Sequence, residues 1–133
     1  MKCQNNDEIQ GRYDKNKQKQ LWDNLKETNT LRQVQEYIKN IHEVRGFEKQ
    51  PVEETMLLLT EEIGELAKAI RKTQTNMCTD INKQYNYDTI ESEVSDCFYV
   101  LTSICNKLNI DLFTCLKEKE KENINRVWKN KKG

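Results

Sequence analysis

The sequence predicts an all-α protein whose helices pack antiparallel as a four-helix-type bundle, preceded by a polar N-terminal tail. Its 133 residues include only four glycines and one proline, so few residues are present that favour the tight turns between strands of a sheet. Apolar residues recur at the spacing of amphipathic helices, and strand-like alternation is absent. Hydrophobic residues make up only 35% of the chain, so we expect the helices to bury part of their apolar faces in a homo-oligomer.

The chain divides into a polar N-terminal segment and one helical domain. Residues 1–28 are polar apart from Leu21, Trp22 and Leu25, and this segment is interpreted as a flexible tail or a short, weakly docked helix. Residues 29–133 are assigned to a single domain, because a chain of this length has room for one core but not comfortably for two.

Local signals set the predicted helix ends. Thr30 and Asp111 are candidate N-caps, and Gly46 ends the first helix. Asp88 and Glu91 have the spacing of a capping box. The predicted helices run from about Thr30 to Arg45, from Pro51 to about Thr73, from Asp88 to about Leu108 and from Asp111 to near Trp128, with a polar loop at 74–87.

Composition excludes several classes of partner. The 22 Lys and Arg residues balance the 22 Asp and Glu residues, whereas a protein that grips a nucleic-acid backbone is usually strongly basic. No apolar run is long enough to span a membrane, and the N-terminus lacks the hydrophobic stretch of a secretory signal. The five cysteines are odd in number and form no CxxC, which favours a cytoplasmic protein.

Two carboxylates interrupt the apolar face of the second predicted helix. At about 100° per residue, Glu62 falls between Leu58 and Leu66, inside the apolar stripe. Glu65 falls at the edge of the same stripe, beside Leu58. An ordinary amphipathic helix would carry apolar residues at these positions.

The third predicted helix repeats this defect. Glu93 falls between Val100 and Ile104 in the apolar stripe, and Asp96 lies about 60° further round, at its edge. The competing interpretation is that each acidic pair lies on a solvated helix face and that the assumed helix phase is slightly wrong.

Four converging carboxylates repel one another unless a cation lies among them. No Lys or Arg falls within either stripe near these acids. We therefore predict a divalent cation held by Glu62, Glu65, Glu93 and Asp96. All-oxygen ligands without His or Cys suit Mg²⁺, with Mn²⁺ possible, and not zinc.

These acids stand in segments that resemble a known family. Residues 58–67 (LLTEEIGELA) and 93–101 (EVSDCFYVL) resemble the ExxE and ExxD helices of the MazG-like nucleoside triphosphate pyrophosphohydrolases. The likeness extends from about Leu31 to Trp128 and takes in Arg45-Gly-Phe47, Asn109-Ile-Asp111-Leu and the C-terminal segment 121–126. That last segment is nearest to the dCTP pyrophosphatase branch.

The resemblance implies a fold and a reaction. The fold would be an all-α bundle completed by dimerisation, as a homodimer or homotetramer. The reaction would convert an NTP or dNTP to the monophosphate and pyrophosphate. Mg²⁺ on Glu62, Glu65, Glu93 and Asp96 would neutralise the triphosphate and activate a water for attack at the α-phosphorus.

The resemblance also assigns further site residues. Glu61 would orient or deprotonate the water, or is a solvated helix residue. Lys121, Asn125 and Arg126 would bind phosphate oxygens, or form a polar helix end. Phe47 replaces the family's usual Trp and would stack on the base, or plug a helix end.

Other aromatic and functional readings stay open. His42, the only histidine, is interpreted as a surface or subunit-contact residue, and Tyr85 and Tyr87 lie where a nucleotide can reach them. Two alternative functions remain: a phosphoribosyl-ATP pyrophosphohydrolase, whose additional N-terminal motifs are not found, and a non-catalytic helical interaction module that retains the fold.

Overall fold

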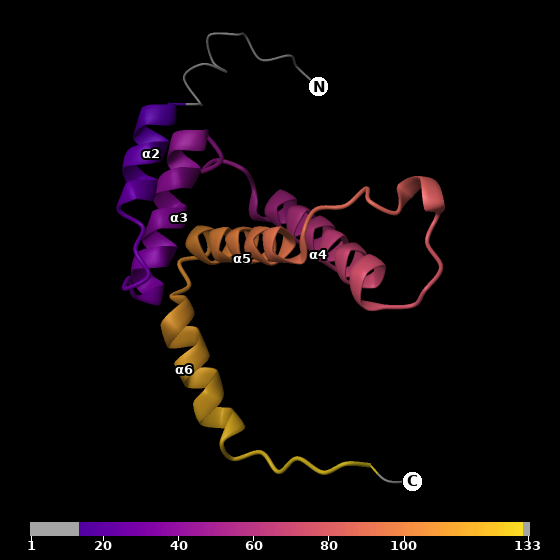
Figure 1. Cartoon of the computed structure of the whole chain (residues 1–133). Helices are drawn as coiled ribbons and strands as arrows, with labels where there is room; N and C mark the ends of the chain where they lie inside the picture. Colours follow the sequence, from indigo (N-terminus) through magenta and orange to yellow (C-terminus); the bar gives the residue numbers. More distant parts are fainter. Residues whose placement is uncertain (1–13, 132–133) are drawn as a thin grey trace.

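The computed structural model describes residues 14–131, and within them every regular element is a helix, as predicted (Figure 1). In chain order the elements are α2 (Lys15–Asp23), α3 (Leu31–Arg45), α4 (Val52–Gln74), the 3₁₀ helix η1 (Ile81–Lys83), α5 (Ile90–Lys107) and α6 (Leu112–Asn123).

The boundaries of α3 confirm the predicted capping. The Thr30 side chain accepts a hydrogen bond from the Gln33 amide, and the Gln33 side chain accepts one from the Thr30 amide. Gly46 ends the helix with a left-handed backbone (φ 75°), which glycine adopts at little cost. Both ends of α3 are therefore fixed by local sequence.

Helix α2 packs against α3 in the segment predicted to be a tail or a weakly docked helix. The Asp14 side chain caps its first turn, and the Arg45 guanidinium at the end of α3 donates a hydrogen bond to Gln18. Residues 1–13 of the predicted tail lie outside the described residues.

Helices α4 and α5 form the most extensive helix pair and run antiparallel. Pro51 is the residue immediately before α4 and not its first helical residue. The predicted Asp88–Glu91 capping box is wrong by one position: the Thr89 hydroxyl caps α5 by accepting from the Ser92 amide at 3.2 Å. A hydroxyl serves as an N-cap as well as a carboxylate does, so two adjacent candidates could not be separated by residue type.

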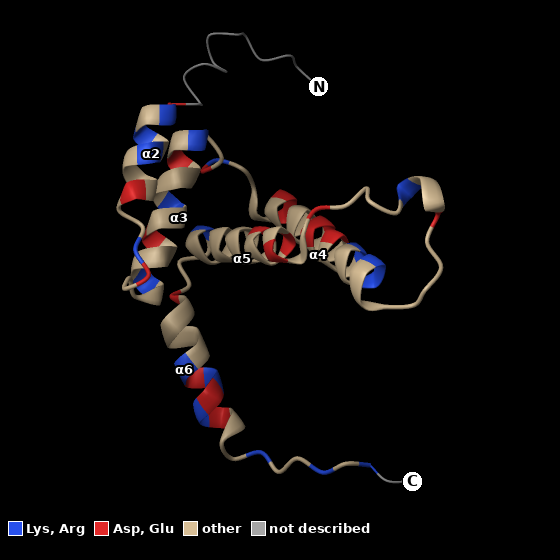
Figure 2. Ribbon diagram, in the orientation of Figure 1, with Lys and Arg blue, Asp and Glu red and all other residues tan. Residues whose placement is uncertain are grey.

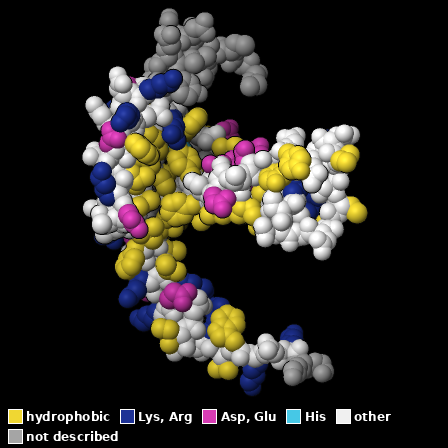
Figure 3. Space-filling model, viewed as in Figure 1, with side chains coloured by type: hydrophobic (Ala, Val, Ile, Leu, Met, Phe, Trp, Pro, Cys, Tyr) yellow, Lys and Arg dark blue, Asp and Glu magenta, His cyan; other side chains and the backbone are white. Residues whose placement is uncertain are grey.

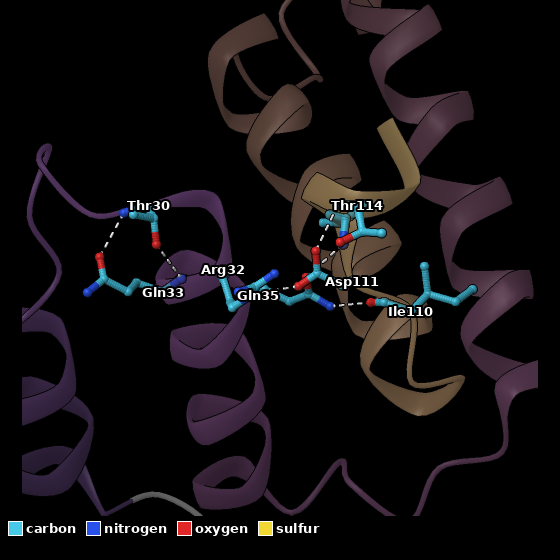
Figure 4. A network of polar contacts seen from close by, with 8 residues as sticks. Thr30, Arg32, Gln33, Gln35, Ile110, Asp111 and Thr114 are labelled. Atoms are coloured by element: carbon cyan, nitrogen blue, oxygen red, sulfur yellow. Dashed lines mark hydrogen bonds and ion pairs between the residues drawn. The ribbon is translucent and has the colours of Figure 1, made fainter. Parts of the chain in front are cut away.

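Helix α6 begins as predicted, at Asp111. Its carboxylate accepts hydrogen bonds from the Thr114 amide and from Arg32 of α3, each at 2.8 Å (Figure 4). Gln35 reinforces this junction, since its side-chain amide donates to the Ile110 carbonyl at 2.6 Å (Figure 4). The predicted extension of this helix to Trp128 is wrong, because α6 ends at Asn123.

The single chain leaves α6 apart from the α4–α5 pair, so one copy does not close a four-helix bundle by itself (Figure 1). The apolar core within residues 14–131 is correspondingly small. Its buried members are Ile38, Ile41, Leu59, Ala69, Val100 and Cys105. Completion of the bundle by dimerisation stays a prediction. Among the described helices, none combines the length and apolar character needed to cross a bilayer.

A carboxylate cluster between two helices

Three of the four predicted metal ligands converge between α4 and α5. Carboxylate oxygens of Glu62, Glu93 and Asp96 all lie within 4.8 Å of one another. The antiparallel packing explains this convergence, because an acid in the middle of α4 meets the first turns of α5. Figure 2 shows acidic residues on both helices in the region where α4 and α5 cross.

The cluster is partly dehydrated. Glu93 is only 2% exposed, and one oxygen each of Glu62 and Glu93 is buried without a hydrogen-bond partner among the described residues. Burial, followed by the neighbouring carboxylates Asp96, Glu65 and Glu93, raises the pKa of Glu62. Burial also raises the pKa of Glu93, with repulsion from Glu65 and Asp88 adding to it. Both shifts follow from like charges in a poorly solvated space.

Glu65 lies beside this group but outside its tightest part. It faces Glu93 across the helix pair, and the two side chains line the same cavity. Glu61 is exposed and lines neither of the cavities next to the acids. The structure therefore brings Glu65 to the cluster and leaves Glu61 on its solvent side.

The donor set fits a hard divalent cation. The two buried, unpartnered carboxylate oxygens are the kind of orphaned acceptor that a metal ion satisfies. The thiol of Cys97 does not compete for the metal ion, because a thiol must lose its proton to bind one. Burial, and then the charges of Glu62 and Glu93, raise the pKa of Cys97 above its ordinary value. At neutral pH the cluster thus offers oxygen ligands only.

An aromatic cavity of about 270 Å³ opens beside the acids. Glu62 and Asp96 line this cavity together with the aromatic residues Phe47 and Tyr99. His42 joins the two rings, with centroids 5.6 Å from Phe47 and 5.0 Å from Tyr99. Phe47, the residue predicted to stack on a base, therefore shares a cavity with two of the predicted metal ligands.

The interpretation of His42 as a surface residue is wrong for this chain, whereas its alternative role as a subunit contact stays a prediction. The side chain is 8% exposed, and burial, with help from Lys107 and Arg45, lowers its pKa to about 4. It is therefore a neutral imidazole at physiological pH. A lone polar residue on a helix face gives no hint of burial in the sequence, because its two aromatic neighbours come from separate segments.

A second, polar cavity of about 310 Å³ lies on the other side of the acids. Its walls come from α4, the start of α5 and the loop between them. The lining residues are Glu65, Lys68, Tyr85, Asn86, Tyr87, Asp88 and Glu93. Lys68 lies outside the apolar stripe of α4, so helix periodicity gave no reason to predict it as a site residue.

The predicted phosphate-binding residues do not join either cavity in this chain. Lys121 lies in the last turn of α6, and Asn125 and Arg126 follow the helix. The Asn125 amide turns back to the Lys121 carbonyl at 3.4 Å, and Arg126 pairs with Glu122 at 3.3 Å. Figure 2 shows this charged end of α6 pointing away from the α4–α5 pair.

Comparison with known protein families identifies the fold family of this segment. A model of the MazG nucleotide pyrophosphohydrolase domain matches residues 50–127, a segment that contains α4, α5, α6 and both cavities' acidic walls. No curated protein and no solved structure matches the chain significantly.

Proposed function

The chain belongs to the MazG nucleotide pyrophosphohydrolase family, and on that premise we propose that it converts a nucleoside triphosphate, ribo- or deoxyribo-, to the monophosphate and pyrophosphate. The observation that carries the proposal is the dehydrated carboxylate cluster, with buried unpartnered oxygens on Glu62 and Glu93. Such a cluster is costly in a protein that has no cation to bind there.

The proposed metal is Mg²⁺, held by Glu62, Glu65, Glu93 and Asp96. Bound there, the ion would neutralise phosphate charge and lower the pKa of a coordinated water. Glu65 joins the set because it faces Glu93 from the neighbouring turn of α4. The protein's part is to hold four carboxylates on two rigid helices, so that little reorganisation is needed when the substrate arrives.

The aromatic cavity supports a site for the base. Phe47 and Tyr99 offer ring faces for stacking, and neutral His42 offers one donor and one acceptor between them. A base held against these rings would place the sugar and the α-phosphate toward Glu62 and Asp96, which line the same cavity. The cavity thus orients the reacting phosphorus by binding a part of the substrate that does not react.

Glu61 is proposed as a residue that orients or deprotonates the attacking water. This proposal rests on the resemblance to the family's acidic helix and on the position of Glu61 next to Glu62 in the sequence, since Glu61 lines neither cavity. The competing interpretation, a solvated helix residue, predicts that Glu61→Gln retains full activity.

A homodimer or homotetramer is proposed as the working form. Many large apolar side chains on α4, α5 and α6 are exposed in the single chain (Figure 3). Apolar surface of this extent is typical of a face that binds another protein chain. Among them are Met56, Leu57, Ile63, Ile70, Val94, Phe98, Leu101, Phe113 and Leu116. A partner covering these faces could also bring its own Lys121, Asn125 and Arg126 to the phosphates.

Pyrophosphate release from a panel of NTPs and dNTPs tests the proposal. With Mg²⁺, the wild type should cleave one or a few nucleotides, and a Glu62→Ala/Glu93→Ala variant should be inactive. Glu53→Ala, an exposed acid in the first turn of α4, serves as the matched control and should remain active. Absence of cleavage of every triphosphate with either Mg²⁺ or Mn²⁺ would leave the non-catalytic helical module as the better explanation.

A further inference from the structure

The two cavities lie one after the other along the α4–α5 pair. The aromatic cavity is lined by Thr55 and Leu58 from the first half of α4, and the polar cavity by Glu65 and Lys68 from its second half. The carboxylate cluster contributes a wall to each. A ligand that fills both cavities must therefore pass the carboxylates in its middle.

Positive charge is concentrated beyond the polar cavity. Burial, and then repulsion from Lys68, Arg71 and Lys83, lowers the pKa of Lys72, and Asp80 opposes this shift, so three other cations lie near the Lys72 ammonium. Figure 2 shows basic residues at the C-terminal end of α4, beyond the acidic residues in the middle of the α4–α5 pair, and η1, which follows the acidic Asp80, adds Lys83. The arrangement attracts an anion that extends from the carboxylates toward the end of α4.

Two of these cations hold the loop in place. The Lys72 ammonium donates hydrogen bonds to the Lys83 and Asn86 carbonyls and lies over the Tyr87 ring, and Arg71 donates to the Cys78 carbonyl. Lys68 differs, because it lines the cavity and takes part in no salt bridge within residues 14–131. Its ammonium is therefore the one in the cavity wall that remains available to a ligand.

We propose that the polar cavity between α4 and the loop at 75–89 binds the pyrophosphate end of the nucleotide, with Lys68 contacting its phosphate oxygens. This inference rests on the proposed function, since it gives the triphosphate a direction along the helix pair. The base would lie in the aromatic cavity, the α-phosphate at the carboxylates, and the leaving pyrophosphate against Lys68 and the amide of Asn86.

The acidic side of the cavity sets a condition on binding. Glu65, Asp88 and Glu93 also line it, and they would repel a bare pyrophosphate anion. A divalent cation shared between these carboxylates and the phosphates removes that repulsion. Inorganic pyrophosphate should therefore bind with Mg²⁺ and not in its absence.

Isothermal titration calorimetry of the full chain with inorganic pyrophosphate, with and without Mg²⁺, tests this. Loss of a hydrogen bond between charged groups should weaken Mg²⁺-pyrophosphate binding about ten-fold or more in Lys68→Gln. Lys68→Arg should recover most of the affinity, because it restores the charge. Lys15→Gln, an exposed lysine of α2, is the control and should bind as the wild type does. Binding of the nucleoside monophosphate product should be equal in all four proteins.

The outcomes separate this inference from the proposed function. If Lys68→Gln binds Mg²⁺-pyrophosphate as tightly as the wild type while the wild type cleaves triphosphates, the cavity assignment is overturned and the reaction stands. If pyrophosphate binding depends on Lys68 but no triphosphate is cleaved, the reaction fails and the phosphate site stands. Equal weakening of monophosphate and pyrophosphate would also overturn it, since the monophosphate should not reach Lys68.

Discussion

The Lys107 ammonium at the end of α5 donates a hydrogen bond to the backbone carbonyl of Phe47 at 3.0 Å. It also reaches the carbonyls of Glu48 at 3.2 Å and Gln50 at 2.7 Å. One side chain thus gathers three carbonyls of the turn between α3 and α4. Because Phe47 and Gln50 line the aromatic cavity, this clamp sets the shape of the proposed base site.

We expect Lys107→Met to damage substrate binding more than chemistry. The variant keeps the apolar stem but loses three hydrogen bonds from a charged donor, so the turn and Phe47 should become mobile. KM for the preferred nucleotide should rise about ten-fold or more, while kcat falls less, because the carboxylates are untouched. Steady-state kinetics check this, and Lys15→Met serves as the control. An unchanged KM would show that the clamp does not shape the base site.

Neutralising the carboxylates should stabilise the metal-free protein. Repulsion and dehydration raise the pKa values of Glu62 and Glu93, so their charged forms oppose folding at pH 7. Glu62→Gln and Glu93→Gln should each raise the melting temperature measured in EDTA, whereas Glu53→Gln should not.

Added Mg²⁺ should make the wild type more stable than the Glu62→Gln and Glu93→Gln variants. The wild type and Glu53→Gln should gain stability with rising Mg²⁺ concentration, because the ion binds the folded state only. The two cluster variants should gain little. Differential scanning fluorimetry across a Mg²⁺ titration measures both effects, and a Mg²⁺ response that survives in Glu93→Gln would contradict the metal site.

The features that could be predicted from the sequence are those fixed within one helix. Thr30, Gly46 and Asp111 act through neighbours three or four residues away, and their caps were found correctly. The approach of Glu62 to Glu93 also followed from helix phase, since both acids interrupt an apolar face and the two faces must pack together.

The rest depends on contacts between separate segments. The burial of His42 requires Phe47 and Tyr99, which arrive from the turn after α3 and from α5. The role of Lys107 requires backbone carbonyls nearly 60 residues away, and carbonyls carry no sequence signal. The early end of α6 at Asn123 has a similar cause, because this helix has no fully buried residue and tertiary packing gives its last turns little support.

The loop at 75–89 should loosen when Lys72 is removed. Lys72 binds two loop carbonyls and lies 5.5 Å from the centre of the Tyr87 ring, so Lys72→Met releases three contacts at once. Limited proteolysis should cut the variant within this loop faster than the wild type, by about ten-fold or more if opening is rate-determining. Lys68→Met, which breaks no loop contact, should be cut at the wild-type rate. Equal rates for Lys72→Met and the wild type would show that other contacts hold the loop.

Acidification should destabilise the protein through His42. Burial first, then the charges of Lys107 and Arg45, lowers the pKa of His42 from the ordinary 6.5 to about 4. Between pH 6.5 and 4, His42 is therefore protonated in the unfolded chain but stays neutral in the folded protein. Stability from this group is complete above pH 6.5 and is lost as the pH falls toward 4.

The loss attributable to His42 between pH 7 and pH 5 should be about 2 kcal/mol of unfolding free energy. The carboxylates Glu62 and Glu93 act in the opposite direction, because their raised pKa values favour the folded state on acidification. Urea unfolding of the wild type and of His42→Asn between pH 7 and pH 5, in EDTA, separates the contribution of His42 from that of the carboxylates. The carboxylate contribution is common to both proteins, so the difference between their unfolding free energies should shrink as the pH falls. A difference that stays constant would mean that the imidazole is as free to protonate in the folded protein as in the unfolded chain.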